Sequence, residues 1–96
     1  MENNKVTLID GTFNVAEAKD ILMNMFTMKI NFHQQKNISH IERFGTPDDN
    51  SKAKVEFLKA EMAKLVTIIA EAEATNKNVS LKVTSAIHID YINDPA

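Results

Sequence analysis

The sequence predicts an α+β domain with the element order β-α-α-β, in which a long antiparallel helical hairpin packs on a small antiparallel sheet. Two long stretches repeat their apolar residues every three or four positions, as helices do, and an alternating stretch lies on either side of them. Gly45 and Pro47 separate the helical stretches and mark the corner of the hairpin. We expect a single domain over residues 1–96, with strands at 5–13 and 79–92 and helices at 15–43 and 47–75.

The first strand is expected to lead directly into the first helix. Asp10-Gly11 predicts a bend or bulge at that junction, because the following residues do not continue an alternating strand. Asn14 is a good helix cap, and Glu17 stands three residues later, as a capping box requires. We expect one long helix, with or without a kink near Asn37; the alternative is a break there and a second short helix. Gly45 ends the helix in both cases.

The first helix is apolar around most of its circumference. One seam consists of Ile21, Met25, Met28 and Phe32, with Ala18 before it, and a second stripe consists of Leu22, Phe26 and Ile30. A helix of this kind must be covered on more than one side, and one partner helix cannot do that.

The second helix has a clear seam of its own, made of Val55, Leu58, Met62, Leu65 and Ile69. Thr46 is the expected cap, with Pro47 at the first helical position, and Ser51 offers a later start. Asn76 is the expected end. Because the spacing repeats over many turns, this helix is expected to pack along its whole length.

The last strand alternates apolar and polar residues, and its weakest point is the Ser85-Ala86 step, where a bulge or bend fits. It is longer than the only strand available to pair with it, so part of its backbone lacks a partner within the chain. An isolated two-stranded sheet is also marginal in water. Together with the apolar first helix, these features predict a homodimer.

Composition excludes several classes of function. The chain has no cysteine, which removes disulfides, thiolate metal sites and cysteine nucleophiles. Its net charge of −2, without a basic cluster, argues against nucleic acid as a partner. No apolar run approaches the length of a membrane span, and the polar start lacks a signal-peptide pattern, so no membrane is expected and the cytoplasm is the expected location.

Candidate chemical sites are few, and each has an ordinary structural interpretation. His33 and His40 lie two helical turns apart, but Lys36 between them would repel a metal ion. His88 and Asp90 are neighbours on one strand face, without a nucleophile beside them. No catalytic residue, metal site or cofactor is therefore predicted. Met23, Met25, Met28 and Met62 form a last candidate, an apolar ligand pocket, although core packing is the simpler role.

The far end of the hairpin is the expected recognition surface. Its residues are Ser39, His40, Arg43, Phe44, Asp48 and Asp49. We expect a small non-enzymatic homodimeric interaction or regulatory module that engages another protein there or at a free strand edge. The alternatives are a small enzyme or metal-binding protein that uses the three histidines with Asp90, and a regulator that binds an apolar ligand in the methionine pocket.

Overall fold

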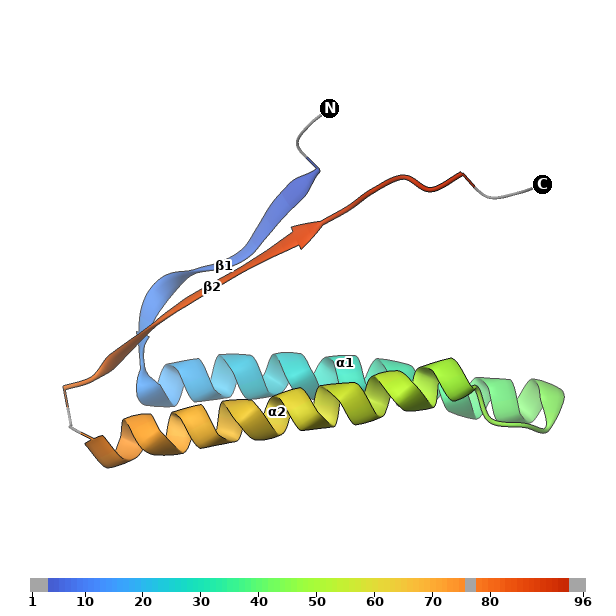
Figure 1. Ribbon diagram of the computed structural model, residues 1–96, viewed down its shortest axis with the longest axis horizontal. Helices are drawn as coiled ribbons and strands as arrows, with labels where there is room; N and C mark the ends of the chain where they lie inside the picture. Colours follow the sequence, from blue (N-terminus) through green and yellow to red (C-terminus); the bar gives the residue numbers. More distant parts are fainter. Residues whose placement is uncertain (1–3, 76–77, 94–96) are drawn as a thin grey trace.

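The computed structural model describes residues 4–75 and 78–93, and it has the predicted order of elements. Strand β1 (Lys5–Asn14) leads into helix α1 (Val15–Phe44), and helix α2 (Asp49–Thr75) returns beside it before strand β2 (Ser80–His88). The two helices form a long antiparallel hairpin, and the two strands form one antiparallel sheet (Figure 1). The predicted α+β class and helical hairpin are confirmed. The predicted end at Asn76 lies outside the described residues.

The sheet and the hairpin diverge like the arms of a V, which we call the open V. The arms meet where β1 enters α1, and the sheet then rises away from the hairpin toward the end where the helices turn (Figure 1). The molecule measures 54 × 38 × 15 Å, and its radius of gyration is 17.4 Å. A compact domain of this length has a radius of gyration of about 12–13 Å. A single chain is therefore extended and thin.

The irregular point of the sheet lies opposite the step where the sequence predicts one. Thr7 pairs with Ala86 and Ile9 pairs with Ser85, so Leu8 is the extra residue of a bulge. No bulge lies at Asp10-Gly11, because the pairing of β1 with β2 is regular through those residues to Asn14, although β1 curves before it enters α1 (Figure 1). β2 ends at His88 rather than at residue 92, and one further hydrogen bond joins Ile89 to Asn4.

The caps of α1 follow the sequence signals. The Asn14 side chain accepts a hydrogen bond from the Glu17 backbone, and the Glu17 side chain accepts one from the Asn14 backbone. α1 is continuous to Phe44 and ends at Gly45, whose φ of 75° is left-handed. α2 begins at Asp49 rather than residue 47.

The structure also corrects the predicted start of α2. Asp48, not Thr46, occupies the capping position, because its carboxylate accepts hydrogen bonds from the backbone and hydroxyl of Ser51.

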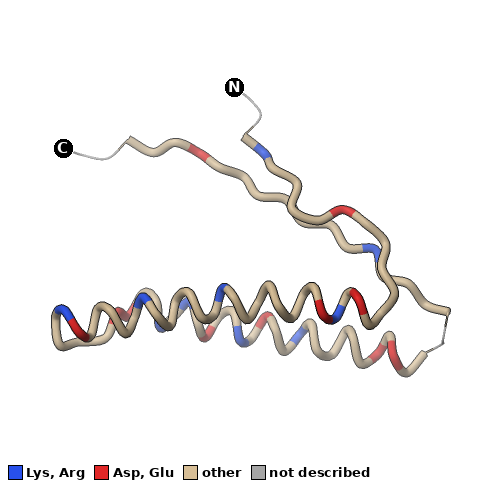
Figure 2. The backbone as a smooth tube through the Cα atoms, turned by 180° about the vertical axis from the view of Figure 1, so that it is seen from behind, with Lys and Arg blue, Asp and Glu red and all other residues tan. Residues whose placement is uncertain are grey.

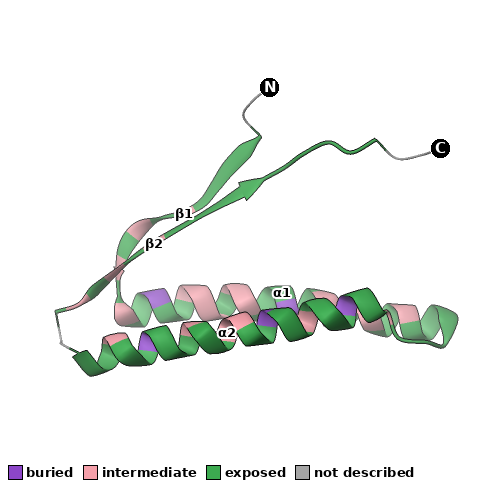
Figure 3. Ribbon diagram, in the orientation of Figure 1, coloured by how far each residue is buried: buried purple, intermediate pink, exposed green. Residues whose placement is uncertain are grey.

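The core is a narrow line between the two helices (Figure 3). Its buried residues are Ala18, Ile30, Ser51, Leu58 and Ile69. The predicted seam of α2 therefore belongs to the core, since its other members, Val55, Met62 and Leu65, are half-buried. In α1 the more buried stripe is the second one, Leu22, Phe26 and Ile30, and the first seam is only partly covered.

Candidate functional site

The tip of the hairpin is held by contacts between the end of α1 and the turn. The Asn37 side-chain oxygen accepts a hydrogen bond of 2.7 Å from the backbone nitrogen of Asp48. His40 Nδ1 lies 2.7 Å from the Thr46 carbonyl oxygen, and the Gly45 nitrogen donates to the Ile41 carbonyl over the same distance. These contacts fix the turn against the last two turns of α1.

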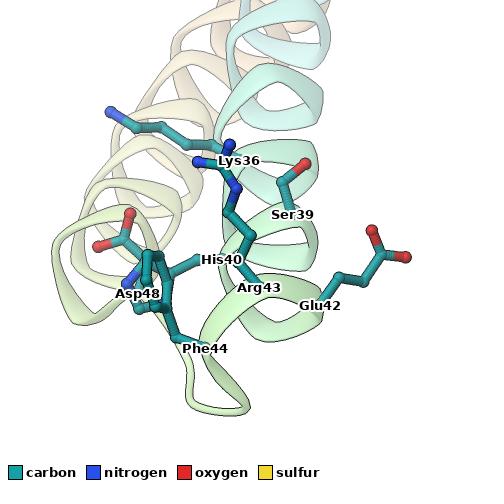
Figure 4. Close-up of a pocket in the computed structure, with 7 residues that line it drawn as sticks. All are labelled: Lys36, Ser39, His40, Glu42, Arg43, Phe44 and Asp48. Carbon is teal, nitrogen blue, oxygen red and sulfur yellow. The ribbon is translucent and has the colours of Figure 1, made fainter.

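A cavity of about 560 Å³ opens at this tip, and we call it the tip cavity (Figure 4). It is lined by Lys36, Ser39, His40, Glu42, Arg43, Phe44 and Asp48. Five of the six residues predicted as a recognition surface thus lie together, and Asp49 is the exception. Lys36 lies outside the predicted tip, whereas Glu42 lies within it without being one of the six named residues. Lys36 lies one turn before Ser39 and His40 on the same helix, so helical spacing was the signal that points to it.

Charges in the tip cavity are arranged unevenly. The Asp48 carboxylate is held by the Ser51 hydroxyl at 2.8 Å, and this hydrogen bond lowers the pKa of Asp48 below its usual value. Lys36, Ser39 and Arg43 project from α1, while the Glu42 carboxylate points away from the other lining groups (Figure 4). The exposed Phe44 ring lies against His40, with ring centroids 4.7 Å apart. The tip cavity therefore offers two cations, the Asp48 carboxylate, a hydroxyl and an aromatic face.

The candidate catalytic and metal-binding residues have separate surroundings. His33 is half-buried on α1, and its Nδ1 is buried without a hydrogen-bond partner among the described residues. His40 is bound to the Thr46 carbonyl, whereas His88 is exposed at the end of β2 and Asp90 follows that strand. Among the residues that the structure describes, no group of three or more histidine, aspartate or glutamate side chains is placed to hold a metal ion.

A second cavity, about 410 Å³ in volume, lies in the open V. It is apolar for the most part, and α1, α2 and β2 all contribute to it. The lining residues are Leu22, Met25, Phe26, Lys29, Phe57, Leu58, Glu61, Val83, Thr84 and Ser85. Of the four predicted pocket methionines, only Met25 lines this groove. Met23 lines a different, smaller cavity of about 80 Å³, and Met28 and Met62 line neither. The cavity is thus an open apolar groove between the arms.

Apolar side chains continue along both arms beyond this groove. On the hairpin, Met28, Phe32 and Phe57 are 71%, 63% and 64% exposed. On the sheet, Ile87 lies on the same face as Leu81 and Val83, since strand residues alternate, and Val6 pairs directly with it. Val6 and Ile87 are also exposed, although Leu81 and Val83 are half-buried. Both arms of the V therefore present uncovered apolar surface.

No match to this chain was found among protein-family models, curated proteins or solved structures. Within residues 4–75 and 78–93, neither helix is both long and apolar enough to cross a membrane.

Proposed function

We propose that this chain is a small non-enzymatic interaction module that acts as a homodimer and uses its hairpin tip to engage another protein. The observation that carries the proposal is the large apolar surface that one chain leaves uncovered. This surface lies on both arms of the open V, the hairpin and the sheet.

The amount of surface supports association. The chain exposes 7661 Å², whereas a compact monomer of 10.8 kDa exposes about 5,500 Å². The surplus is roughly 2,000 Å² per chain, and a standard interface buries about 800 Å² per partner. Two chains that cover this surplus would make an interface in the range of obligate homodimers.

The composition of the uncovered surface supports the same conclusion. Monomeric proteins rarely expose large continuous apolar patches, and those that do usually bind something there. Met28 and Phe32 are one helical turn apart, so they form a single apolar strip on α1. The sheet has only two strands, and both of its edges lack a neighbouring strand within the described residues. A second chain can cover the strip and protect the edges together.

The tip cavity supports a second contact, with a different protein. It lies at the end of the hairpin farthest from the junction of the arms, where Phe44 is 64% exposed beside Lys36 and Arg43. Arginine and aromatic side chains are enriched in protein interfaces.

We further propose a cytoplasmic location, because a chain without cysteine has no disulfide that an oxidising compartment would maintain.

The groove in the open V favours one rival function, a regulator that binds an apolar ligand. Its volume of about 410 Å³ lies within the range of small-molecule sites. Such sites bury most of the ligand, however, and this groove is open along the V. A second protein chain covers an open groove more completely, so the homodimer is favoured.

Light scattering across a dilution series tests the proposal. We expect a mass twice the 10.8 kDa of one chain, with a monomer appearing only on dilution. A mass that stays at 10.8 kDa at the highest concentration contradicts the homodimer. Addition of an apolar dye distinguishes the homodimer from the rival function, a regulator that binds an apolar ligand. A monomer with an open ligand groove binds the dye strongly, whereas a dimer with a covered groove does not.

A further inference from the structure

We propose that β2 pairs with β2 of a second copy of this chain, so that the two sheets join into one four-stranded antiparallel sheet. In the register that we infer, Ala86 lies opposite its own copy, and Lys82 lies opposite the partner's Asp90. This inference rests on the homodimer proposed above and names the strand edge and the register through which the two chains join.

The two edges of the sheet differ in how well they resist a further strand. β1 contains the bulge at Leu8 and also Lys5, Asp10 and Gly11. Bulges and charged side chains are the usual features that keep an edge strand from pairing with another chain. In β2, by contrast, the pairing is regular, and residues 83–89 contain no lysine, arginine, aspartate or glutamate and no proline or glycine. β2 is therefore the edge that is open to another strand.

The backbone of β2 has the orientation that such pairing requires. The Ile89 nitrogen donates a hydrogen bond of 2.9 Å to the Asn4 carbonyl, so the backbone polar groups of Ile89 face β1. In an antiparallel ladder the backbone groups of successive residues point to opposite edges of the strand. Those of Thr84, Ala86 and His88 therefore face the edge of β2 that has no neighbouring strand within the described residues. They form a row of donors and acceptors for a second strand.

The apolar pattern of β2 limits the possible registers. Residues directly opposite each other in an antiparallel pair lie on the same face of the sheet, so the half-buried face of Leu81 and Val83 continues only if odd-numbered residues meet odd-numbered ones. With the two-fold axis at Ala86, Val83 lies opposite the partner's Ile89, and Leu81 lies opposite the partner's Tyr91. Ile89 and Tyr91 are 52% and 94% exposed in one chain. This register gives both of them an apolar neighbour.

The charges at the ends of β2 distinguish this register from its neighbours. Lys82 and Asp90 bound the uncharged stretch, as one blue and one red segment of the tube in Figure 2. They are eight residues apart with Ala86 at the midpoint, so an axis at Ala86 places each lysine opposite the partner's aspartate. Opposite charges on directly facing residues stabilise a strand pair. Moving the axis by one residue in either direction removes both ion pairs.

Symmetry and the two faces of the sheet determine the strand direction. A two-fold axis perpendicular to the sheet makes the two β2 strands antiparallel and keeps both hairpins on one face of the joined sheet. Parallel pairing about an axis along the strands turns one sheet over, so its polar face would continue the apolar face of the other. Pairing of β2 with β1 of another copy does not close as a dimer. Among the arrangements that use β2, the antiparallel pair alone is closed and keeps the apolar face continuous.

Disulfide formation tests the register, because the natural chain has no cysteine. Directly opposite Cα atoms in an antiparallel pair are about 4.5–5.5 Å apart, a separation that a disulfide can span. Ala86→Cys should therefore form a covalent dimer in high yield under mild oxidation. Thr84→Cys is the matched control, since Thr84 is exposed on the same face of the same strand. Its two copies would be about 13 Å apart along the strands, so it should form almost none.

The outcomes separate the register from the homodimer. A dimeric mass by light scattering in reducing buffer, without a disulfide in oxidised Ala86→Cys, overturns the pairing of β2 and leaves the homodimer intact. Equal yields from Ala86→Cys and Thr84→Cys would indicate parallel or unspecific contact and also overturn the register. A mass of one chain at the highest concentration overturns both proposals.

Charge reversal gives an independent readout. Lys82→Glu or Asp90→Lys alone should raise the dissociation constant of the dimer about tenfold, because each places like charges opposite each other at two equivalent positions. The double variant Lys82→Glu/Asp90→Lys should restore it. The control is Asp10→Lys, which makes the same change on the same sheet face but on β1, since Asp10 pairs with Thr84, and should leave the dissociation constant unchanged. Equal weakening by Asp10→Lys, or no recovery in the double variant, overturns the register.

Discussion

Asn37 and Asp48 are eleven residues apart, and the side-chain oxygen of Asn37 accepts a hydrogen bond of 2.7 Å from the backbone nitrogen of Asp48. This bond joins α1 to the residue that caps α2. It explains why the second helix begins where it does. The Thr46-Pro47 pair is an equally good start by local chemistry, but the contact with Asn37 and the Ser51 hydroxyl together select Asp48.

Replacing Asn37 with alanine should therefore destabilise the protein, because the Asp48 amide loses a partly buried partner. We expect a loss of about 1 kcal/mol, the usual net value of such a hydrogen bond. Thermal unfolding should show a midpoint several degrees lower. Gln35→Ala changes an exposed polar residue on the same helix and is the control. Equal midpoints for the two variants would mean that the Asn37 contact does not hold the turn.

Gly45→Ala should destabilise the hairpin through backbone conformation alone. Gly45 has a φ of 75°, and a Cβ built on it meets no atom within 4 Å, so no clash contributes. A residue other than glycine costs about 1 kcal/mol or more in the left-handed region. Gly45→Asn should cost less, because asparagine tolerates that region better. Urea unfolding measures the stability of both variants. This explanation requires Gly45→Ala to be less stable than Gly45→Asn.

The hydrogen bond between Ser51 and Asp48 predicts a pH dependence of stability. It lowers the pKa of Asp48 in the folded state below the usual 3.8, so the folded state favours the charged carboxylate. This contribution is present above the unfolded pKa and is lost as the pH falls through the lowered folded pKa. Asp48→Asn should therefore flatten the dependence of stability on pH below about 4.

The Asp48 prediction has two checks. NMR titration should find that Ser51→Ala moves the pKa of Asp48 back toward its usual value, since the hydroxyl is the main cause of the shift. The control is Asp49→Asn, which removes the same charge one residue later, outside the contact with the Ser51 hydroxyl. The stability of Asp49→Asn should depend more steeply on pH at low pH than the stability of Asp48→Asn does. An unchanged slope in Asp48→Asn would exclude Asp48 as its source.

The sequence predicts those parts of the fold that depend on neighbouring residues. The capping box of Asn14 and Glu17 and the left-handed end at Gly45 are local, and both are found as expected. The bulge at Leu8 was misplaced because the extra residue sits on β1, opposite the weak Ser85-Ala86 step, and pairing register is not a local property.

The exposure of side chains along α1 also depends on residues that are distant in the chain, so the sequence predicts it only in part. α1 has two apolar stripes of similar strength, and only the position of the sheet and α2 decides that Ile30 is buried while Phe32 is exposed. The tip residues are predicted as a recognition surface from their type and their place after the last apolar turns, and that role stays a prediction. Lys36 was missed because it belongs to the preceding turn of α1, and the cavity becomes visible only when the turn folds back to Asp48.

The contrast between Ile30 and Phe32 leads to a test that separates folding from association. Leu58 is 8% exposed within one chain, so Leu58→Asp should unfold the protein, because a buried unpaired charge is costly. Phe32 is 63% exposed within one chain, so Phe32→Asp should leave the chain folded and prevent dimer formation. Circular dichroism and light scattering of both variants distinguish the two effects. A dimeric and stable Phe32→Asp protein would mean that the exposed strip of α1 is not the surface that the second chain covers.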